Sequence, residues 1–496
     1  MRVKNNHKLA IPILAIVGLC MPMTASAEIG PLFVPNPSVV SRPISRPPQD
    51  RTSAESWLRN WNNTALNATA TDHTPPSAGE HLGPHRSSRA LAIVQIAVFE
   101  AVNAASGGKY KSYTGLPISG GASMKAAISQ AAHDTLVALY PSQSATFAAQ
   151  LADDKVALVN SASITAGLAL GGDAAESILN KRANDGSTLV EEFWVSATNP
   201  IFHPISTAAG YWKQDPITYD LIKVALGSKW STVAPFVLTA PEQFRIAPLP
   251  ALNSRTYTEA YKEVLNLGGD GVITPTKRTK EQTEIGIFWA YDGTPKLAAP
   301  PRLYNQILVK IARDRKTDVV GTARLLALAN MAMADEGIAA WESKYYYQFC
   351  RPITCIREGA ADGNAYTIGD VNFTQLGAPA SNTSNPNFTP PFPAYPSGHA
   401  GFGGALFQTL RNFYGTDKIA FTFVSDEYNG VTKDNKGTVR PLKSRSFTTL
   451  SQAEEENGQS RVYLGIHWSF DKTEGIKQGR KVANLVFQKA FKKLAI

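Results

Sequence analysis

Apolar residues recur at helical spacing through most of the chain beyond residue 85. Ala, Leu, Ile and Val repeat every three or four positions, and Gly- or Pro-rich breaks separate one such segment from the next. This period is typical of helices that bury one face or more. The helices predicted from it span residues 87–105, 123–139, 143–159, 167–184, 256–265, 277–290, 302–313, 322–349, 399–414, 451–468 and 471–494.

Three stretches interrupt this pattern. Residues 28–85 are rich in Pro, Ser, Thr and Asn, which predicts an extended arm with one short helix at 54–61. Residues 185–250 carry aromatics, Pro and short apolar runs, which predicts an irregular crossing with one helix at 219–224. Residues 378–396 are rich in Pro and Asn and should form a loop.

The architecture predicted from these elements is all-α. Because no strand-rich region of any length occurs, the helices have to bury their apolar faces against one another. We expect two helical bundles in one body, an N-terminal bundle over residues 86–255 and a C-terminal bundle over residues 256–496. The extended N-terminal arm precedes them, and long loops connect the helices.

The first 27 residues have the three-part pattern of a secretory signal peptide. Three basic residues precede an apolar run over residues 9–20, and Ala25, Ser26 and Ala27 provide a small-residue cleavage site. We therefore expect residues 1–27 to be removed and the protein to be exported, to the periplasm or as a secreted protein.

Composition and charge exclude several classes of protein. The chain has 496 residues, of which 43% are hydrophobic and 18% charged, so it is neither disordered nor fibrous. Its formal charge of +9 falls further when the basic leader is removed, which argues against a nucleic-acid partner. No later apolar run reaches the roughly 20 residues of a membrane span, so we expect no membrane insertion after cleavage. The oligomeric state stays open, a homodimer being one option.

Two cysteines remain after the leader. Cys350 and Cys355 lie five positions apart on either side of Pro352, a spacing poorly suited to pairing within a helix. We interpret them as small buried apolar residues and not as a disulfide.

The first segment with chemical potential runs from Lys344 to Arg351. The seven positions between these cations turn a helix by about 700°, within roughly 20° of two whole turns, so both should project from one face. Two unpaired cations on one face favour an anion. An exposed basic stripe is the alternative for this segment taken alone.

The second segment is Pro396-Ser397-Gly398-His399 at the start of a predicted helix. Ser397 offers a hydroxyl, Gly398 allows close approach of its backbone N–H, and a helix N-terminus favours negative charge. His399 beside this cradle could exchange protons with a bound oxygen. Alone, such a sequence is usually only a turn.

The third segment is Ser460-Arg461-x5-His467, predicted to lie inside a helix whose capping box is Ser451 and Glu454. Arg461 adds a planar fork of donors for a tetrahedral oxyanion, and His467 a nitrogen that could attack or coordinate its centre. Each His alone could be a satisfied core residue, but the three segments in this order are highly specific.

Together the segments resemble the signature of the type 2 phosphatidic acid phosphatase superfamily, whose acid phosphatases and vanadium-dependent haloperoxidases share one oxyanion pocket. The match to the triple motif is complete. The resemblance implies that His399 is the acid/base and that His467 bonds the central phosphorus or vanadium. It also implies the residues that hold the equatorial oxygens: Lys344, Arg351, Ser397, Gly398 and Arg461.

Features outside the motif favour the haloperoxidases. Residues 288–293 and 300–306 resemble a segment of the chloroperoxidase type of vanadium enzyme that small phosphatases of the superfamily lack. Trp341 and Phe392 fall where that type places the aromatic residues of the halide pocket. Asp292 would orient the region near His399, a helix-end carboxylate facing solvent being the alternative.

The resemblance therefore implies a vanadium-dependent haloperoxidase with orthovanadate as its cofactor. Hydrogen peroxide bound at the vanadium, polarised by Lys344, would oxidise bromide, iodide and, as an extension, chloride to hypohalous acid, with a small organic acceptor as a further partner. Two alternatives stay open: an exported acid phosphatase that forms a phosphohistidine at His467, and a non-enzymatic oxyanion-binding protein.

Overall fold

The computed structural model describes residues 49–494, which contain thirteen α-helices and two short antiparallel sheets. The predicted signal peptide and residues 28–48 of the predicted arm therefore lie outside the described residues. The predicted all-α class is confirmed. The helices are α1 (Ala54–Asp72), α2 (Gly83–Ala105), α3 (Met124–Leu139), α4 (Ser144–Ala157), α5 (Ala162–Arg182), α6 (Arg255–Leu267), α7 (Lys280–Phe288), α8 (Pro300–Asp314), α9 (Val319–Tyr347), α10 (Pro352–Arg357), α11 (Gly398–Tyr414), α12 (Leu450–Tyr463) and α13 (Ser469–Lys489).

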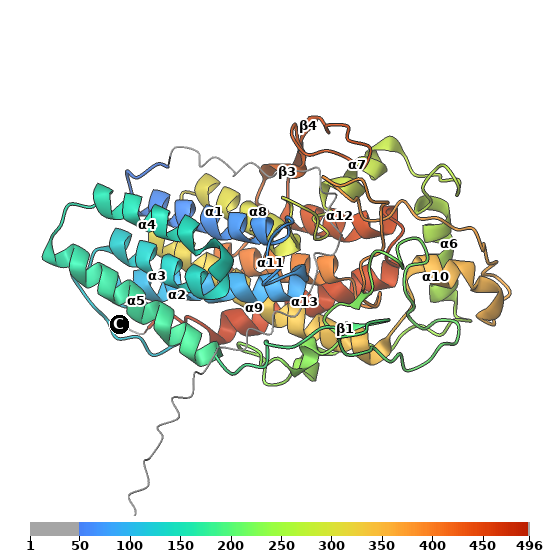
Figure 1. The fold of residues 1–496 in the computed structure, drawn as a ribbon, viewed down its shortest axis with the longest axis horizontal. Helices are drawn as coiled ribbons and strands as arrows, with labels where there is room; N and C mark the ends of the chain where they lie inside the picture. Colours follow the sequence, from blue (N-terminus) through green and yellow to red (C-terminus); the bar gives the residue numbers. More distant parts are fainter. Residues whose placement is uncertain (1–48, 495–496) are drawn as a thin grey trace, which may run out of the picture.

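Three helices occupy the middle of the molecule. Figure 1 shows α9, α11 and α13 between α1 to α5 at one end and α6 and α10 at the other. α2 packs along α9, and α11 packs on both α9 and α13. The largest cluster of buried apolar side chains runs through both halves of the chain, from Leu58 to Phe491. The division into two bundles at residue 256 stays a prediction.

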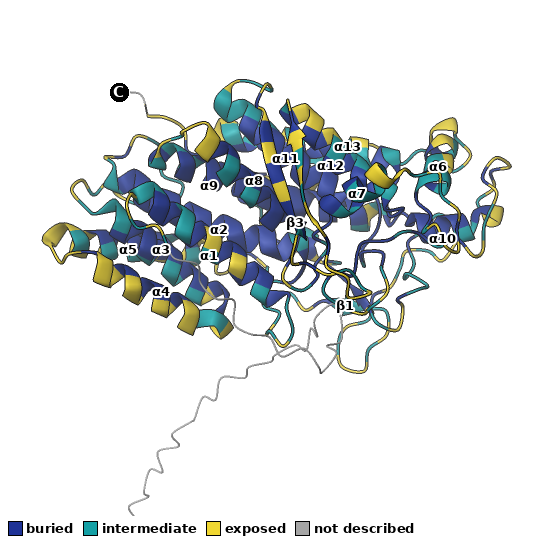
Figure 2. Cartoon of the chain, turned by 90° about the horizontal axis from the view of Figure 1, so that it is seen from above, coloured by how far each residue is buried: buried dark blue, intermediate teal, exposed yellow. Residues whose placement is uncertain are grey.

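Burial follows the same arrangement. Figure 2 shows buried residues through the centre of the molecule and exposed residues along its edge, as on α4. α2 is long and apolar enough to cross a bilayer, yet 94% of its most apolar window is buried inside the protein. Its hydrophobicity is thus accounted for by packing in the core.

Two predicted elements differ from the structure at the N-terminal end. α1 is longer than the predicted helix at 54–61, so the described part of the arm is not extended. The sequence pattern does not reveal the full length of α1, because some of its inward-facing positions are polar and form buried hydrogen bonds. Asn62 accepts a hydrogen bond from Gln95, and the Trp61 indole donates one to Asp154. The predicted helix at 219–224 is instead a turn that leads into β2 (Val224–Ala225), which pairs with β1 (Glu192–Phe193).

A β-hairpin between α11 and α12 was not predicted. β3 (Phe421–Asn429) pairs with β4 (Leu442–Phe447) in antiparallel register. Phe421 and Phe423 point inward while Thr422 and Val424 face solvent, the period of two that marks a half-buried strand.

Candidate active site

The start of α11 forms one side of the candidate site. Ser397 is the N-cap residue, and its hydroxyl accepts a hydrogen bond from the N–H of Ala400 at 3.4 Å. Gly398 is the first helical residue, and a Cβ there would come within 3.4 Å of the Trp341 ring. The predicted helix start behind the Pro-Ser-Gly turn is confirmed, so the positive end of the helix dipole lies at this turn.

Lys344 is fully buried in the last turn of α9. Its Nζ donates to the carbonyl oxygens of Pro393 at 2.8 Å and Ala394 at 3.1 Å, and also to that of Pro396. Burial and the charge of Arg351 lower the pKa of Lys344 well below its usual value. The ammonium group thus organises the loop that leads into the cradle.

The prediction that one helix carries Lys344 and Arg351 on one face is wrong. α9 ends at Tyr347, Gln348 has a left-handed φ of 45°, and Arg351 is the N-cap of the next helix, α10. The aromatic, polar run before Arg351 gave no signal for this break. Both cations still contact the loop before Ser397, because Arg351 Nε donates to Phe392 O at 2.8 Å.

Arg351 connects this loop to the third motif. Its Nη1 donates to Ile466 O and to Nε2 of His467, each at 2.8 Å. Its Nη2 has no hydrogen-bond partner among the described residues. Burial lowers the pKa of Arg351 to about 9, although the nearby Asp471 opposes the shift.

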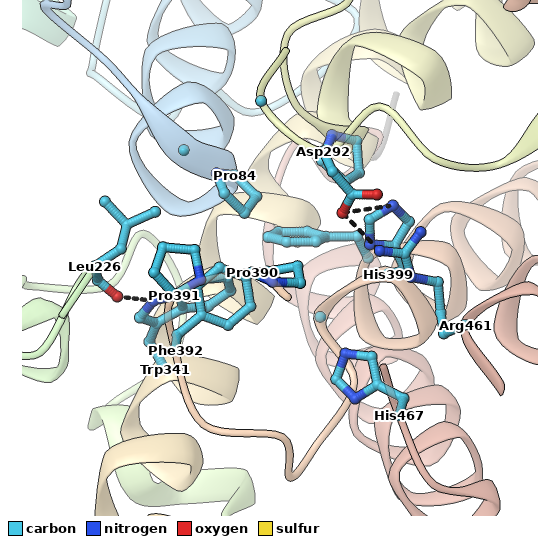
Figure 3. Close-up of a pocket in the computed structure, with 15 residues that line it drawn as sticks. Pro84, Leu226, Asp292, Trp341, Pro390, Pro391, Phe392, His399, Arg461 and His467 are labelled. Atoms are coloured by element: carbon cyan, nitrogen blue, oxygen red, sulfur yellow. Dashed lines mark hydrogen bonds and ion pairs between the residues drawn. The ribbon is translucent and has the colours of Figure 1, made fainter. Parts of the chain in front are cut away.

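Arg461, Asp292 and His399 form a second group. Arg461 Nη2 lies 2.6 Å from Asp292 Oδ1, which in turn lies 4.0 Å from His399 Nε2 (Figure 3). The Asp292 side chain is only 4% exposed, so the solvent-facing alternative is wrong. Nε and Nη1 of Arg461 lack partners in the described structure. His399 Nε2 donates to the carbonyl of Ala290 at 2.5 Å.

His467 does not lie within a helix, contrary to prediction. α12 ends at Tyr463, and Gly465, with a φ of 72°, turns the chain toward α13. The N-cap of α12 is Thr449, so the predicted capping box is also wrong. The glycine at this turn permits the left-handed conformation that breaks the helix.

Asp471 orients His467 and was not predicted as a site residue from the sequence. Its Oδ2 lies 2.9 Å from Nδ1 of His467 and accepts the N–H of Trp468 at 3.0 Å. The spacing His-x3-Asp was a signal in the sequence that the two side chains could pair. It indicates this pairing only once the turn between α12 and α13 is known. Burial raises the pKa of Asp471 to about 7.

Both imidazoles are neutral in this environment. Burial, with the charge of Arg461, lowers the pKa of His399 well below its usual value. Burial and the charge of Arg351 do the same for His467. A neutral ring keeps one nitrogen with a free electron pair, which is what proton transfer or coordination requires.

A small, largely apolar cavity opens onto these groups. Trp341 and Phe392 form part of its wall, with ring centroids 4.8 Å apart. Seven of the ten predicted site residues line it, whereas Lys344, Arg351 and Ser397 lie outside its lining. Apolar residues that were not predicted as site residues complete the lining: Pro84, Leu226, Pro390 and Pro391, which are labelled in Figure 3, with Pro300 and Phe402.

Cys350 and Cys355 form a disulfide, so the prediction of two unpaired thiols is wrong. The prediction assumed one helix through both residues. The break after Tyr347 places Cys350 before α10 and Cys355 within it, and their Cα atoms are 5.8 Å apart, within the range for a disulfide.

Fold and site together define a class: an all-helical protein with a buried pocket of cations, a helix N-terminus and two neutral imidazoles. Comparison with known proteins is more specific. Residues 324–495 match a family model described as the second helical-bundle domain of VCPO. A segment of 271 residues is 38% identical to vanadium chloroperoxidase of Curvularia inaequalis, covering 47% of this chain and 44% of that protein. The family match is thus confined to residues 324–495, and the chain spans less than half the length of this curated relative.

Solved structures agree on the fold. A structure described as the first bacterial vanadium-dependent iodoperoxidase superposes with a TM-score of 0.67 at 24% identity, covering 90% of this chain and 99% of its own. An apo-type bacterial vanadium-dependent chloroperoxidase gives 0.61 at 17% identity, covering 84% and 95%.

Proposed function

We propose that this protein is a vanadium-dependent haloperoxidase, which oxidises bromide, iodide and, as an extension, chloride with hydrogen peroxide to hypohalous acid. The observation that carries the proposal is the set of buried guanidinium N–H groups that have no partner within residues 49–494, next to two neutral imidazoles and an apolar cavity. The family domain over residues 324–495 supports vanadate over phosphate as the anion.

The residues present fit vanadate. Three unpartnered donors, Nη2 of Arg351 and Nε and Nη1 of Arg461, are buried, and a buried donor without a partner costs about 1–3 kcal/mol. An oxyanion would satisfy them. Since His467 Nε2 accepts from Arg351, its electron pair points toward the same cations. Arg351, Ser397, Gly398 and Arg461 would hold the oxygens, and His467 the vanadium. Lys344, whose three N–H groups donate to carbonyl oxygens in this structure, would add its positive charge.

Each side chain then has a definable task. Bound vanadate supplies an electrophilic centre at which hydrogen peroxide becomes reactive toward halide. The cations neutralise negative charge on the oxygens. In the neutral His399 ring, the N–H at Nε2 donates a hydrogen bond to Ala290 O, so Nδ1 is the nitrogen that can accept a proton. Trp341 and Phe392 exclude water from the halide side.

A vanadate titration of purified protein tests this function. Activity would be assayed in parallel with hydrogen peroxide plus bromide and with p-nitrophenyl phosphate. Vanadate-dependent activity with the peroxide couple alone supports the proposal. Hydrolysis of the phosphate ester inhibited by vanadate would identify an acid phosphatase, and tight vanadate uptake with neither activity an oxyanion-binding protein.

Removal of the Lys344 charge should weaken the anion site. In Lys344→Met we expect vanadate affinity and turnover to fall about tenfold or more, because charge-assisted contacts contribute most in a buried site. Calorimetric titration with vanadate and steady-state rates measure both effects. Unchanged values would contradict a role for this ammonium group.

Phe392 should influence halide preference. Chloride is the hardest halide to oxidise, so a polar, hydrated side chain in the wall should impair chloride turnover more than bromide turnover. We expect this order in Phe392→His, measured with three halides alongside a thermal melt. Equal losses for all halides with a lowered melting temperature would mean that Phe392 only packs beneath the turn.

We also propose that the protein acts outside the cytoplasm. The leader pattern motivates this, and the Cys350–Cys355 disulfide supports it, because such bonds persist in oxidising compartments. Mass spectrometry of the mature N-terminus from the native host would reveal cleavage after Ala27.

A further inference from the structure

One backbone segment from the N-terminal half holds two parts of the cavity wall together. The carbonyl of Leu226 accepts the indole N–H of Trp341 at 3.0 Å, and the N–H of Leu226 donates to Pro391 O at 2.9 Å (Figure 3). Trp341 and Pro391 both line the cavity, as does Leu226. We call residues 226–227 the latch, because they connect α9 to the loop before Ser397.

Gly227 brings the latch directly against the indole. Its φ is +76°, and a Cβ at this position would lie 2.4 Å from both Cδ1 and Nε1 of Trp341. Only glycine therefore fits here. The N–H of Gly227 donates at 2.7 Å to Oε2 of Glu191, a residue that does not itself line the cavity.

Glu191 is anchored by charge inside the N-terminal half. Its side chain is 3% exposed, and Oε1 accepts from Nε of Arg86 at 3.0 Å and lies 3.5 Å from Nε2 of His85. Burial would raise the pKa of Glu191, but the contacts with His85 and Arg86 outweigh it and lower the pKa to about 2. The carboxylate is thus charged at any working pH.

His85 forms a second contact between Glu191 and the Trp341 indole. Its ring centroid lies 5.1 Å from that of Trp341 at an interplanar angle of 32°, and 4.7 Å from that of Trp230. Glu191 is therefore connected to the Trp341 indole in two ways, through the N–H of Gly227 and through the ring of His85.

We propose that Glu191 is a positioning residue for the halide pocket: by holding the latch it fixes the Trp341 indole, and it thereby affects halide binding more strongly than binding at the oxyanion site. The inference rests on the proposed haloperoxidase function for its substrate. It assigns control of halide binding to the N-terminal half, whereas all the oxyanion motifs belong to the C-terminal half.

The test compares Glu191→Gln with Asp185→Asn. The latter removes the charge of an equally buried carboxylate, paired with Arg89 at 2.7 Å in the same half of the chain, with no contact to the latch. In Glu191→Gln we expect the KM for bromide and iodide to rise about threefold or more, with kcat and vanadate affinity within about twofold of wild type, because a wall that only holds the halide contributes equally to ground-state and transition-state binding. Amide hydrogen exchange at residues 226–227 should accelerate only in this variant.

Gly227→Ala tests the position of the Trp341 indole independently of Glu191. Its Cβ displaces the indole without touching the Glu191 charge, so it should reproduce the rise in halide KM. Two results would overturn the proposal: unchanged halide KM and unchanged exchange in Glu191→Gln, or equal losses of halide binding and vanadate affinity in Glu191→Gln and Asp185→Asn. If the wild-type protein oxidises no halide, the proposed function fails, and amide hydrogen exchange at residues 226–227 alone then tests the positioning role of Glu191. Faster exchange in Glu191→Gln but not in Asp185→Asn supports that role, and unchanged exchange in Glu191→Gln rejects it.

Discussion

Replacing His467 by Ala is expected to abolish retention of vanadate, whereas His399→Ala should retain it and lose turnover by a factor of about 10² to 10⁴, the usual contribution of a general acid/base. The structure gives the two rings different surroundings. His467 is fixed between Asp471 and Arg351, with its electron pair among the cations. His399 lies between Ala290 O and Asp292 beside the cavity.

The vanadium-to-protein ratio after gel filtration, together with steady-state rates at saturating vanadate, measures the two effects separately. His133→Ala is the matched control, because this half-buried ring pairs with Asp134 on α3, and no residue of α3 lines the cavity. Loss of vanadium to the same extent in His467→Ala and His399→Ala would contradict the division of roles.

The sequence was sufficient where the signal is local. Helical spacing located twelve of the thirteen α-helices, most within a few residues, because apolar side chains three and four apart share a face. The three motifs were recognisable for a similar reason, since each one lies within nine residues. The three motifs lie together in the structure, as the resemblance implied. Lys344 donates to the carbonyl of Pro396 beside Ser397, and Arg351 contacts His467.

The sequence did not reveal where two helices end, nor the contacts between residues distant in the chain. The end of α9 before Arg351 and the turn at Gly465 depend on packing against other segments, so helical periodicity ran through both. The disulfide was missed as a direct consequence of the first error. Leu226 reaches the cavity from a segment more than 100 residues before Trp341, and no local pattern predicts such a contact.

Asp471 is the clearest case of a site residue that only the structure reveals, and its replacement should have a large effect. In Asp471→Asn we expect vanadate affinity to fall about 10- to 100-fold, the usual cost of losing a partner that orients a ligand. In its ionised form the carboxylate can only accept, so it keeps the proton of His467 on Nδ1 and leaves the electron pair on Nε2, which accepts from Arg351 in this structure.

An amide in place of Asp471 can present its NH₂ to Nδ1 and so move the ring proton to Nε2, which removes the electron pair that the oxyanion centre needs. Calorimetric titration with vanadate measures the loss. Asp335→Asn is the matched control, because Asp335 is equally buried but accepts only backbone N–H groups of residues 236–238. It should lower the melting temperature and leave vanadate affinity unchanged. If both variants bind vanadate as tightly as wild type, Asp471 does not set the tautomer of His467, and the electron pair of that ring must be oriented by Arg351 alone.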